Sequence, residues 1–261
     1  DVVLGSGRDM DSLLKSVNTL ISKQIDGLIV LPVEVNSEVG ATSAEDTRRF
    51  YAELERILSG IPSGGLPTVL LENCEIAGIS GHIRVDYRGG AELAVDHLVE
   101  MGHTKIGMLY HTVQEGIWKD RYLGFVQGME KHGCTVRPEY IMGCSDSVLS
   151  GFEAGRVLLG REDRPTAIYC ANDEIAVGVR NAAAACGLRV PEDISIIGHD
   201  GSIFSQTTYP RLTTVSIGSF EMGKACTEQL YRALSGVKIE AVRTVEPVLL
   251  RGESVCRPPE N

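Results

Sequence analysis

The fold is predicted first from one stretch of the chain, Ala167-Ile168-Tyr169-Cys170-Ala171-Asn172-Asp173-Glu174. Five largely apolar residues are followed by Asn172 and Asp173, and a helix is predicted over Glu174–Cys186. A second apolar segment, Ile194–Ile197, follows that helix. A strand, a helix and a further strand in this order are typical of a βαβ unit. The stretch therefore predicts a parallel sheet covered by helices.

The same alternation extends outward over nearly the whole chain. Continuous apolar runs such as Leu28–Leu31 suit strands that are buried on both faces of a parallel sheet. Strands are predicted at residues 2–4, 28–31, 68–71, 83–86, 105–110, 140–142, 167–170, 194–197 and 245–250. Helices are predicted at 10–24, 44–58, 89–101, 119–132, 152–159, 174–186 and 220–234. Since this number of strands is large for one sheet, two doubly wound lobes joined by crossing segments are expected.

Composition limits the classes of function. The 261 residues are 43% hydrophobic and 23% charged, with a net charge of −10 and a pI near 5.1, which indicates a globular chain that binds nucleic acid poorly. No apolar run reaches the length of a membrane span. The seven cysteines include no C-x-x-C pair, so we expect neither a zinc site nor a disulfide framework, and we predict a cytoplasmic location. The start at Asp1, without Met or a signal-peptide pattern, is interpreted as a cut within a longer protein.

Candidate site residues follow from the rule that ligands bind beyond the carboxyl ends of parallel strands. Asn172 follows one strand and is predicted to face the ligand, with Asp173 as the N-cap of the next helix. Asp200 ends another strand and could accept two hydrogen bonds from a diol, although a solvent-exposed loop aspartate has the same pattern. Arg121 lies in the first turn of a predicted helix, where a cation is unfavourable. It could grip ligand oxygens or pair with Asp120 or Glu115.

Trp118 is the single tryptophan and precedes Arg121 closely. It could form a stacking platform for a sugar ring or belong to the core. The motifs of phosphate-binding loops, dinucleotide-binding loops, serine hydrolases and zinc proteases are absent. We therefore predict no enzyme activity, no catalytic residue, no metal site and no cofactor.

Three stretches together resemble the effector-binding domain of the LacI/GalR family of bacterial transcriptional regulators. They are residues 89–107, which read GGAELAVDHLVEMGHTKIG, residues 165–178, which read PTAIYCANDEIAVG, and residues 187–200, which read GLRVPEDISIIGHD. The segments Pro210–Val215 and Leu249–Ser254 and the motif Arg121-x-x-Gly124-Phe125 extend the match to essentially the whole chain.

The resemblance implies a periplasmic-binding-protein-like type I fold with two Rossmann-like lobes and a ligand cleft between them. It places the N-terminal lobe at 1–101 plus 218–236, without its first strand and helix, and the C-terminal lobe at 102–217 plus 237–261. The family's effector-binding Arg, Asn and Asp correspond to Arg121, Asn172 and Asp200, and Asp86 is a weaker fourth candidate. One departure is Gly201, which stands where many members carry a second Asp. The segments 203–206 and 34–58 resemble the arabinose-repressor-like branch.

The resemblance implies an effector-sensing and dimerisation domain, with operator DNA bound by an N-terminal domain that this sequence does not contain. The ligand residues suit a monosaccharide better than a purine or a phosphate, and a homodimer without membrane contact is expected. An extracytoplasmic solute-binding protein of a sugar transporter is the alternative, because it shares the fold. An enzyme acting on sugars or nucleotides is a third hypothesis, which no catalytic motif supports.

Overall fold

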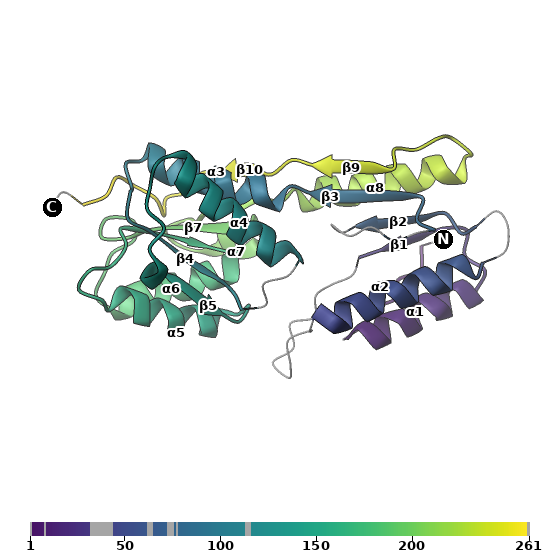
Figure 1. Cartoon of the computed structure of the whole chain (residues 1–261), viewed down its shortest axis with the longest axis horizontal. Helices are drawn as coiled ribbons and strands as arrows, with labels where there is room; N and C mark the ends of the chain where they lie inside the picture. The colour runs from purple at the N-terminus through teal and green to yellow at the C-terminus, as the bar shows by residue number, and fades with distance from the viewer. Residues whose placement is uncertain are drawn as a thin grey trace. The chain divides into compact units, whose positions relative to one another are not determined.

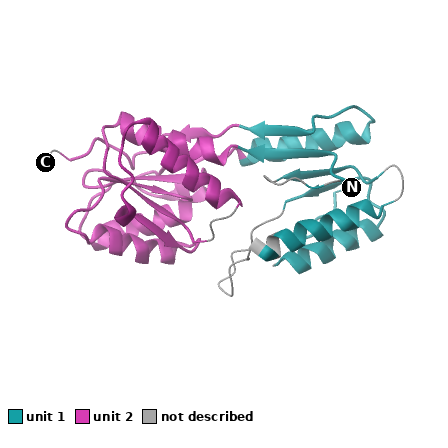
Figure 2. Cartoon of the chain, in the orientation of Figure 1, with its two compact units in different colours: residues 1–85, 219–245 teal, residues 86–218, 246–261 magenta. Residues whose placement is uncertain are grey.

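The computed structural model describes residues 2–7, 9–31, 44–61, 65–71, 76, 78–112 and 116–259. The chain forms two compact units, which Figure 2 distinguishes by colour. Unit 1 comprises Asp1–Val85 and Ser219–Val245, and unit 2 comprises Asp86–Gly218 and Glu246–Asn261. The chain therefore passes between the units three times, as expected for lobes joined by crossing segments.

The unit boundaries differ from the predicted ones at two elements. Helix α3 (Tyr87–Glu100), predicted for the N-terminal lobe 1–101, belongs to unit 2 because it packs on helix α4 (Gly116–Lys131). Strand β9 (Val242–Val245), predicted for the C-terminal lobe 237–261, belongs to unit 1 because it pairs with strand β3 (Gly81–Val85). Each of these elements therefore belongs to the unit that contains the helix or strand with which it packs or pairs.

Unit 1 contains a four-stranded parallel sheet in the order β1-β2-β3-β9, with β1 at Leu28–Val30 and β2 at Thr68–Leu71. Its helices are α1 (Met10–Ser22), α2 (Ala44–Ser59) and α8 (Ser219–Leu234). The predicted strand at residues 2–4 was wrong, because Val2 and Leu4 are exposed and have no strand partner among the described residues.

Unit 2 contains the larger sheet, in the order β10-β8-β7-β6-β4-β5, and all its strands are parallel except β10 (Figure 1). The strands are β4 (Ile106–His111), β5 (Ile141–Cys144), β6 (Ala167–Cys170), β7 (Ser195–Asp200), β8 (Thr213–Ser216) and β10 (Val248–Leu250). The remaining helices are η1 (Pro138–Tyr140), α5 (Val148–Leu159), α6 (Asp173–Ala185) and α7 (Ile203–Thr207). The predicted α/β fold with parallel sheets is confirmed.

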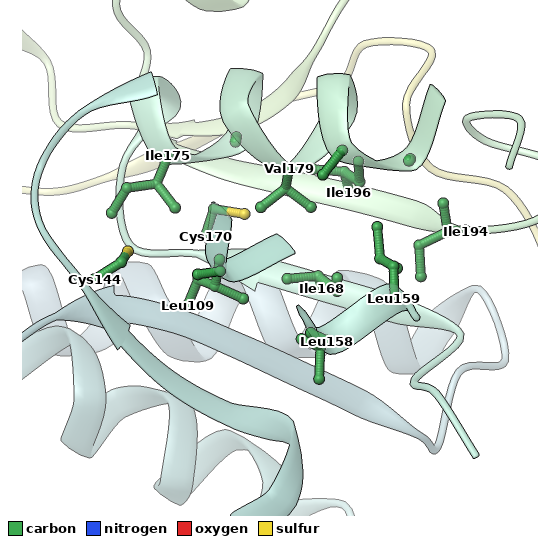
Figure 3. Packing of buried hydrophobic residues seen from close by; sticks show 14 of the residues in the cluster. Leu109, Cys144, Leu158, Leu159, Ile168, Cys170, Ile175, Val179, Ile194 and Ile196 are labelled. Carbon is green, nitrogen blue, oxygen red and sulfur yellow. The ribbon is translucent and has the colours of Figure 1, made fainter. Parts of the chain in front are cut away.

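Helices cover both faces of the unit 2 sheet, as the continuous apolar runs predicted. Ile168 and Cys170 of β6 pack with α5 and α6 in one buried cluster, which Figure 3 shows. Ala167 and Tyr169 point to the opposite face and pack with α3 and α4. Because alternate residues of a strand point to opposite faces, one apolar strand supplies both cores. Its carboxyl end is thereby held fixed between two helical layers.

Candidate ligand-binding site

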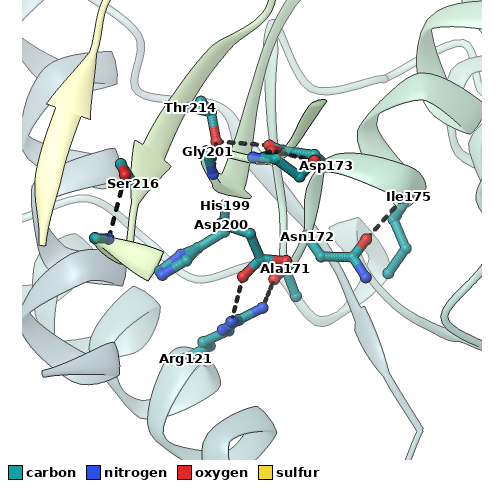
Figure 4. A network of polar contacts seen from close by, with 12 residues as sticks. Arg121, Ala171, Asn172, Asp173, Ile175, His199, Asp200, Gly201, Thr214 and Ser216 are labelled. Atoms are coloured by element: carbon teal, nitrogen blue, oxygen red, sulfur yellow. Dashed lines mark hydrogen bonds and ion pairs between the residues drawn. The ribbon is translucent and has the colours of Figure 1, made fainter. Parts of the chain in front are cut away.

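The candidate site lies at the carboxyl edge of the unit 2 sheet, where β6 and β7 end. Three of the residues predicted from the sequence meet there, and Figure 4 shows their contacts: Asn172 follows β6, Asp200 ends β7, and Arg121 reaches them from α4. Arg121 contacts Asp200 and the backbone of Ala171, the residue before Asn172.

Arg121 is the most buried charged side chain of the group, with 2% of its surface exposed. Its Nη2 donates to Asp200 Oδ1 at 2.6 Å, and its Nη1 donates to the carbonyl oxygen of Ala171. Its Nε has no hydrogen-bond partner within the described residues. A guanidinium has five N–H donors, so the two contacts leave donor capacity for a bound molecule.

Two aromatic rings pack against the Arg121 guanidinium. Its carbon Cζ lies 4.9 Å from the ring centroid of Tyr87 on α3 and 5.0 Å from that of Trp118 on α4. Contacts of this kind are favourable because the faces of aromatic rings carry partial negative charge. Trp118 is only 6% exposed and also stacks on His111 at 4.9 Å between centroids. This packing favours Trp118 as a support for Arg121 over its predicted role as a sugar platform.

The position of Arg121 on its helix differs from the prediction. Helix α4 begins at Gly116, so Arg121 lies in the second turn, and the unfavourable first-turn position was wrong. Of the two predicted alternative partners, Asp120 accepts from Arg88 Nη2 at 3.2 Å, and Glu115 lies outside the described residues. Arg121 pairs instead with Asp200, far away in the sequence.

The N-cap of α6 is Asn172 and not Asp173, so the predicted capping assignment was wrong. Asn172 is the N-cap of α6, because its Oδ1 accepts from the backbone N–H of Ile175 at 2.8 Å. Asp173 accepts from the backbone N–H of Ser202 at 2.7 Å and from Thr214 Oγ1 at 2.6 Å, and so fixes the segment after β7. The cap uses only the oxygen of Asn172. Its amide Nδ2 makes no hydrogen bond to the described part of the chain and can still donate to a ligand.

Asp200 has an unusual backbone, with φ at +108°. This region is sparsely populated by residues other than glycine, and such strain is most common at functional sites. Its side chain is 29% exposed. Burial raises the pKa of Asp200 to about 6, although the positive charge of Arg121 opposes this effect.

Gly201 explains the departure from the pattern with two aspartates. Its φ is +68°, and a Cβ at this position would lie 2.8 Å from Ser216 of β8. A second aspartate would therefore clash with β8 and strain the backbone in this chain.

Asp86, the weaker candidate, ends the segment after β3 and caps α3. Its Oδ1 accepts from the backbone N–H of Gly89 at 2.9 Å, and a Cβ on Gly89 would collide with this carboxylate. The structure thus gives Asp86 a capping role, and a ligand contact through its other oxygen stays a prediction.

The sequence-based interpretation missed the residues beneath Arg121 and Asp200. His199 is buried, and its Nδ1 is hydrogen-bonded to the hydroxyl of Tyr169 at 2.8 Å. Burial, together with the charge of Arg121, holds the pKa of His199 well below its ordinary value, so the ring is neutral. The sequence did contain a signal for His199, because it directly precedes Asp200 on the same strand. Alternate residues of a strand face opposite sides, and both faces of this sheet are covered, so His199 had to point into a core.

The site offers hydrogen-bond donors on Arg121 and Asn172 and acceptor oxygens on Asp200, held on rigid elements. In the part of the chain that the structure describes, no group of His, Cys, Asp or Glu side chains could hold a metal ion. Among the same residues, no helix combines the length and apolar character needed to cross a membrane. Such polar groups at the carboxyl edge of a doubly wound sheet are typical of the class of proteins that bind small molecules.

Comparison with known proteins identifies the family. The family model of the periplasmic binding protein-like domain matches residues 95–255, and the chain belongs to this family as an effector-binding domain of the LacI/GalR type.

Relatives and solved structures agree on this fold. A transcriptional repressor named PurR from Aliivibrio salmonicida is 30% identical over 222 residues, which cover 85% of this chain and 62% of the repressor. The chain thus spans less than two thirds of that relative. A LacI-family regulator from Mycobacterium smegmatis is 27% identical, with a TM-score of 0.75 and coverage of 100% of this chain and 89% of that one. The lac repressor dimer bound to operator has a TM-score of 0.74 at 23% identity, with coverage of 96% and 80%.

Proposed function

We propose that the chain is the effector-sensing and dimerisation domain of a bacterial transcriptional regulator, with a monosaccharide or a similar polyol as its effector. The observation that carries this proposal is the buried Arg121, which two aromatic rings and the Ala171 carbonyl hold beside Asp200. Operator binding is assigned to a DNA-binding domain outside this sequence, since the relative named as an HTH-type repressor is longer than the chain. The net charge of −10 agrees with this division.

A neutral polyol fits the charges of the site better than a phosphate. Because Asp200 neutralises Arg121 at 2.6 Å, the pair presents no net positive charge to an anion. Each hydroxyl of a sugar both donates and accepts, so a vicinal diol can accept from Arg121 or Asn172 and donate to Asp200. Hydrogen bonds to ionised groups are roughly twice as strong as those between neutral groups, which favours this arrangement.

The repressor names of the relatives favour a regulator over the solute-binding protein of a transporter. In a regulator, an effector acts by binding two states of the protein with different affinity, and the coupling is typically about 1–3 kcal/mol. The lac repressor neighbour is a dimer, and unit 2 carries exposed apolar side chains on α5, on α7 and after α7, namely Leu149, Ile203 and Tyr209. We assign a homodimer contact to this surface and a cytoplasmic location to the protein.

Calorimetric titration of a panel of monosaccharides with the wild type and with Arg121→Ala tests the site. We expect one sugar to bind the wild type and its affinity to fall about 100-fold in Arg121→Ala, because a charge-assisted bond pair is lost. Arg161→Ala, at an exposed position of unit 2, is the control and should bind like the wild type. Circular dichroism shows whether each variant is folded. Unchanged affinity in a folded Arg121→Ala protein would refute the assignment.

A further inference from the structure

A pocket in unit 2, separate from the candidate site, lies along the free edge of the sheet at β10. Its volume is 1020 Å³, and none of the five candidate residues of the first site lines it. Helix α3 forms one wall through Leu93 and His97, and the segment around α7 and Arg211 forms the other. The apolar lining includes Leu93, Leu212 and Leu249. Its size suits a small organic molecule.

His97 is the first sign that this groove takes a ligand. The side chain is 6% exposed, and its Nδ1 is buried without a hydrogen-bond partner among the described residues. Buried polar atoms are nearly always paired in native proteins, because an unpaired one is costly. Burial and the nearby charge of Arg251 lower the pKa of His97, against the effect of Glu100, so the imidazole is neutral and can donate or accept.

The charged side chains along the groove are the second observation that indicates a ligand. Arg211 and Arg251 have no ion-pair partner within the described ranges, and Arg211 Nη2 donates to the carbonyl oxygen of Arg251 at 2.7 Å, which brings them to one end. Glu253 accepts from the backbone N–H of Arg211 at 3.1 Å.

The acidic residues of the lining compensate these arginines only in part. Asp96 accepts from Lys131 at 2.7 Å and from His132 at 2.7 Å, so its charge is already balanced. Glu100 is exposed at the end of α3. The end of the groove at Arg211 and Arg251 is therefore positive and borders an apolar floor, while Glu100 places a negative charge on the α3 wall.

We propose that this groove is a second binding site, specific for an organic anion with an apolar body, such as a carboxylate or a sulfonate. The anionic group contacts Arg251 and Arg211, the body packs on Leu93, Leu212 and Leu249, and a polar atom pairs with His97. A peptide that extends the sheet suits this edge less well, because β10 has three residues and follows Pro247. Short edge strands and adjacent prolines disfavour such pairing.

Methyl NMR of leucine-labelled protein, titrated with 4-phenylbutyrate, tests the proposal. We expect saturable shifts at the methyls of Leu93, Leu212 and Leu249, and none at Leu149 on α5. The uncharged 4-phenylbutanol should bind at least about tenfold more weakly, since it lacks the anionic group that contacts both arginines. Arg251→Gln should weaken 4-phenylbutyrate about tenfold, since it removes one of these charge-assisted contacts. Arg161→Gln, which changes the same charge at an exposed position outside the groove, should leave the affinity unchanged.

Three results would overturn this assignment. They are shifts confined to methyls outside the groove, equal affinity for the acid and the alcohol, and equal affinity of the wild type and Arg251→Gln. Both substitutions are at exposed positions, so the variants should remain folded. The experiment needs no sugar and no intact Arg121 site, so its outcome is independent of the proposed effector.

Discussion

Arg121 and Asp200 form a pair in which each residue depends on the other. Arg121 is almost completely buried, and Asp200 compensates its charge at 2.6 Å. Removing one member of a buried pair leaves the other uncompensated, which costs up to about 3–5 kcal/mol, and less where one partner is partly exposed as Asp200 is. The pair is therefore both a structural element of unit 2 and the proposed ligand contact.

Ligand affinity should depend on pH through Asp200. Its pKa is raised to about 6, so protonation below that pH replaces the charged carboxylate that accepts from a sugar hydroxyl with a weaker, neutral acceptor. We expect the affinity for the effector to fall as the pH is lowered through about 6, because the ligand favours the ionised form. Calorimetry at a series of pH values measures this. Asp200→Asn should bind more weakly, and its affinity should change little over the same range.

Asp200 should affect the stability of the fold in the opposite direction, so that its contribution decreases as the pH rises. The folded chain retains the Asp200 proton up to about pH 6, whereas the unfolded chain releases it near the ordinary aspartate pKa of 3.8. The contribution of Asp200 to the free energy of unfolding therefore falls as the pH rises through this window. Urea unfolding of the wild type and Asp200→Asn isolates the effect. A constant difference between the two proteins across the window would contradict the raised pKa.

The cap and the ligand contact of Asn172 can be separated by substitution. Asn172→Ala removes the cap of α6 and should lower the free energy of unfolding by about 1 kcal/mol. Asn172→Asp keeps an equally good capping oxygen but replaces the free amide donor with an acceptor. We expect Asn172→Asp to keep most of the stability and to bind the effector at least about tenfold more weakly. Full affinity in Asn172→Asp would limit this residue to capping.

At the scale of helices, Gly124 allows α3 and α4 to approach closely. A Cβ on Gly124 would overlap with the carbonyl oxygen of Arg88 and would lie only 2.9 Å from Ala91 Cβ. This close approach brings Tyr87 on α3 into contact with Arg121 on α4. Gly124 therefore helps to position Arg121 without being part of the candidate site.

Two glycine substitutions should therefore change stability in opposite directions. Gly124→Ala should destabilise the fold by about 1–3 kcal/mol, because α3 and α4 must separate. Gly223→Ala, on α8 with no atom within 4 Å of the added Cβ, should stabilise it by up to about 1 kcal/mol through helix propensity. Chemical denaturation measures both. A stabilising Gly124→Ala would show that the two helices do not pack as closely as described.

Much of the element order could be predicted, because apolar runs and turn residues are local signals. Strand β8 was missed because Thr213, Thr214 and Ser216 are polar, and β9 and β10 were merged into one predicted strand at 245–250. The N-cap of α6 was predicted at Asp173 instead of Asn172 because the two residues are adjacent and both are good caps. The packing of Tyr87 and Trp118 on Arg121 depends on contacts between separate helices, which no local pattern contains.

At the scale of the whole molecule, dimer formation is the property that the proposed function requires. Ile203 is 64% exposed on α7, and α6 lies in contact with both α7 and α5. We expect sedimentation equilibrium to give a dimer, and Ile203→Glu to shift it toward monomer because a charge in an apolar contact is unfavourable. Arg161→Glu, an exposed charge reversal in the same unit, is the control. A dimer that Ile203→Glu does not weaken would exclude this surface.

The most direct test of the central claim is a crystal structure of the chain with the monosaccharide that binds most tightly in calorimetry. We predict that sugar oxygens lie within hydrogen-bond distance of the Arg121 guanidinium and the Asp200 carboxylate, with Asn172 Nδ2 as a further donor. A sugar ordered elsewhere, with Arg121 still bonded only to Asp200 and Ala171, would contradict the account.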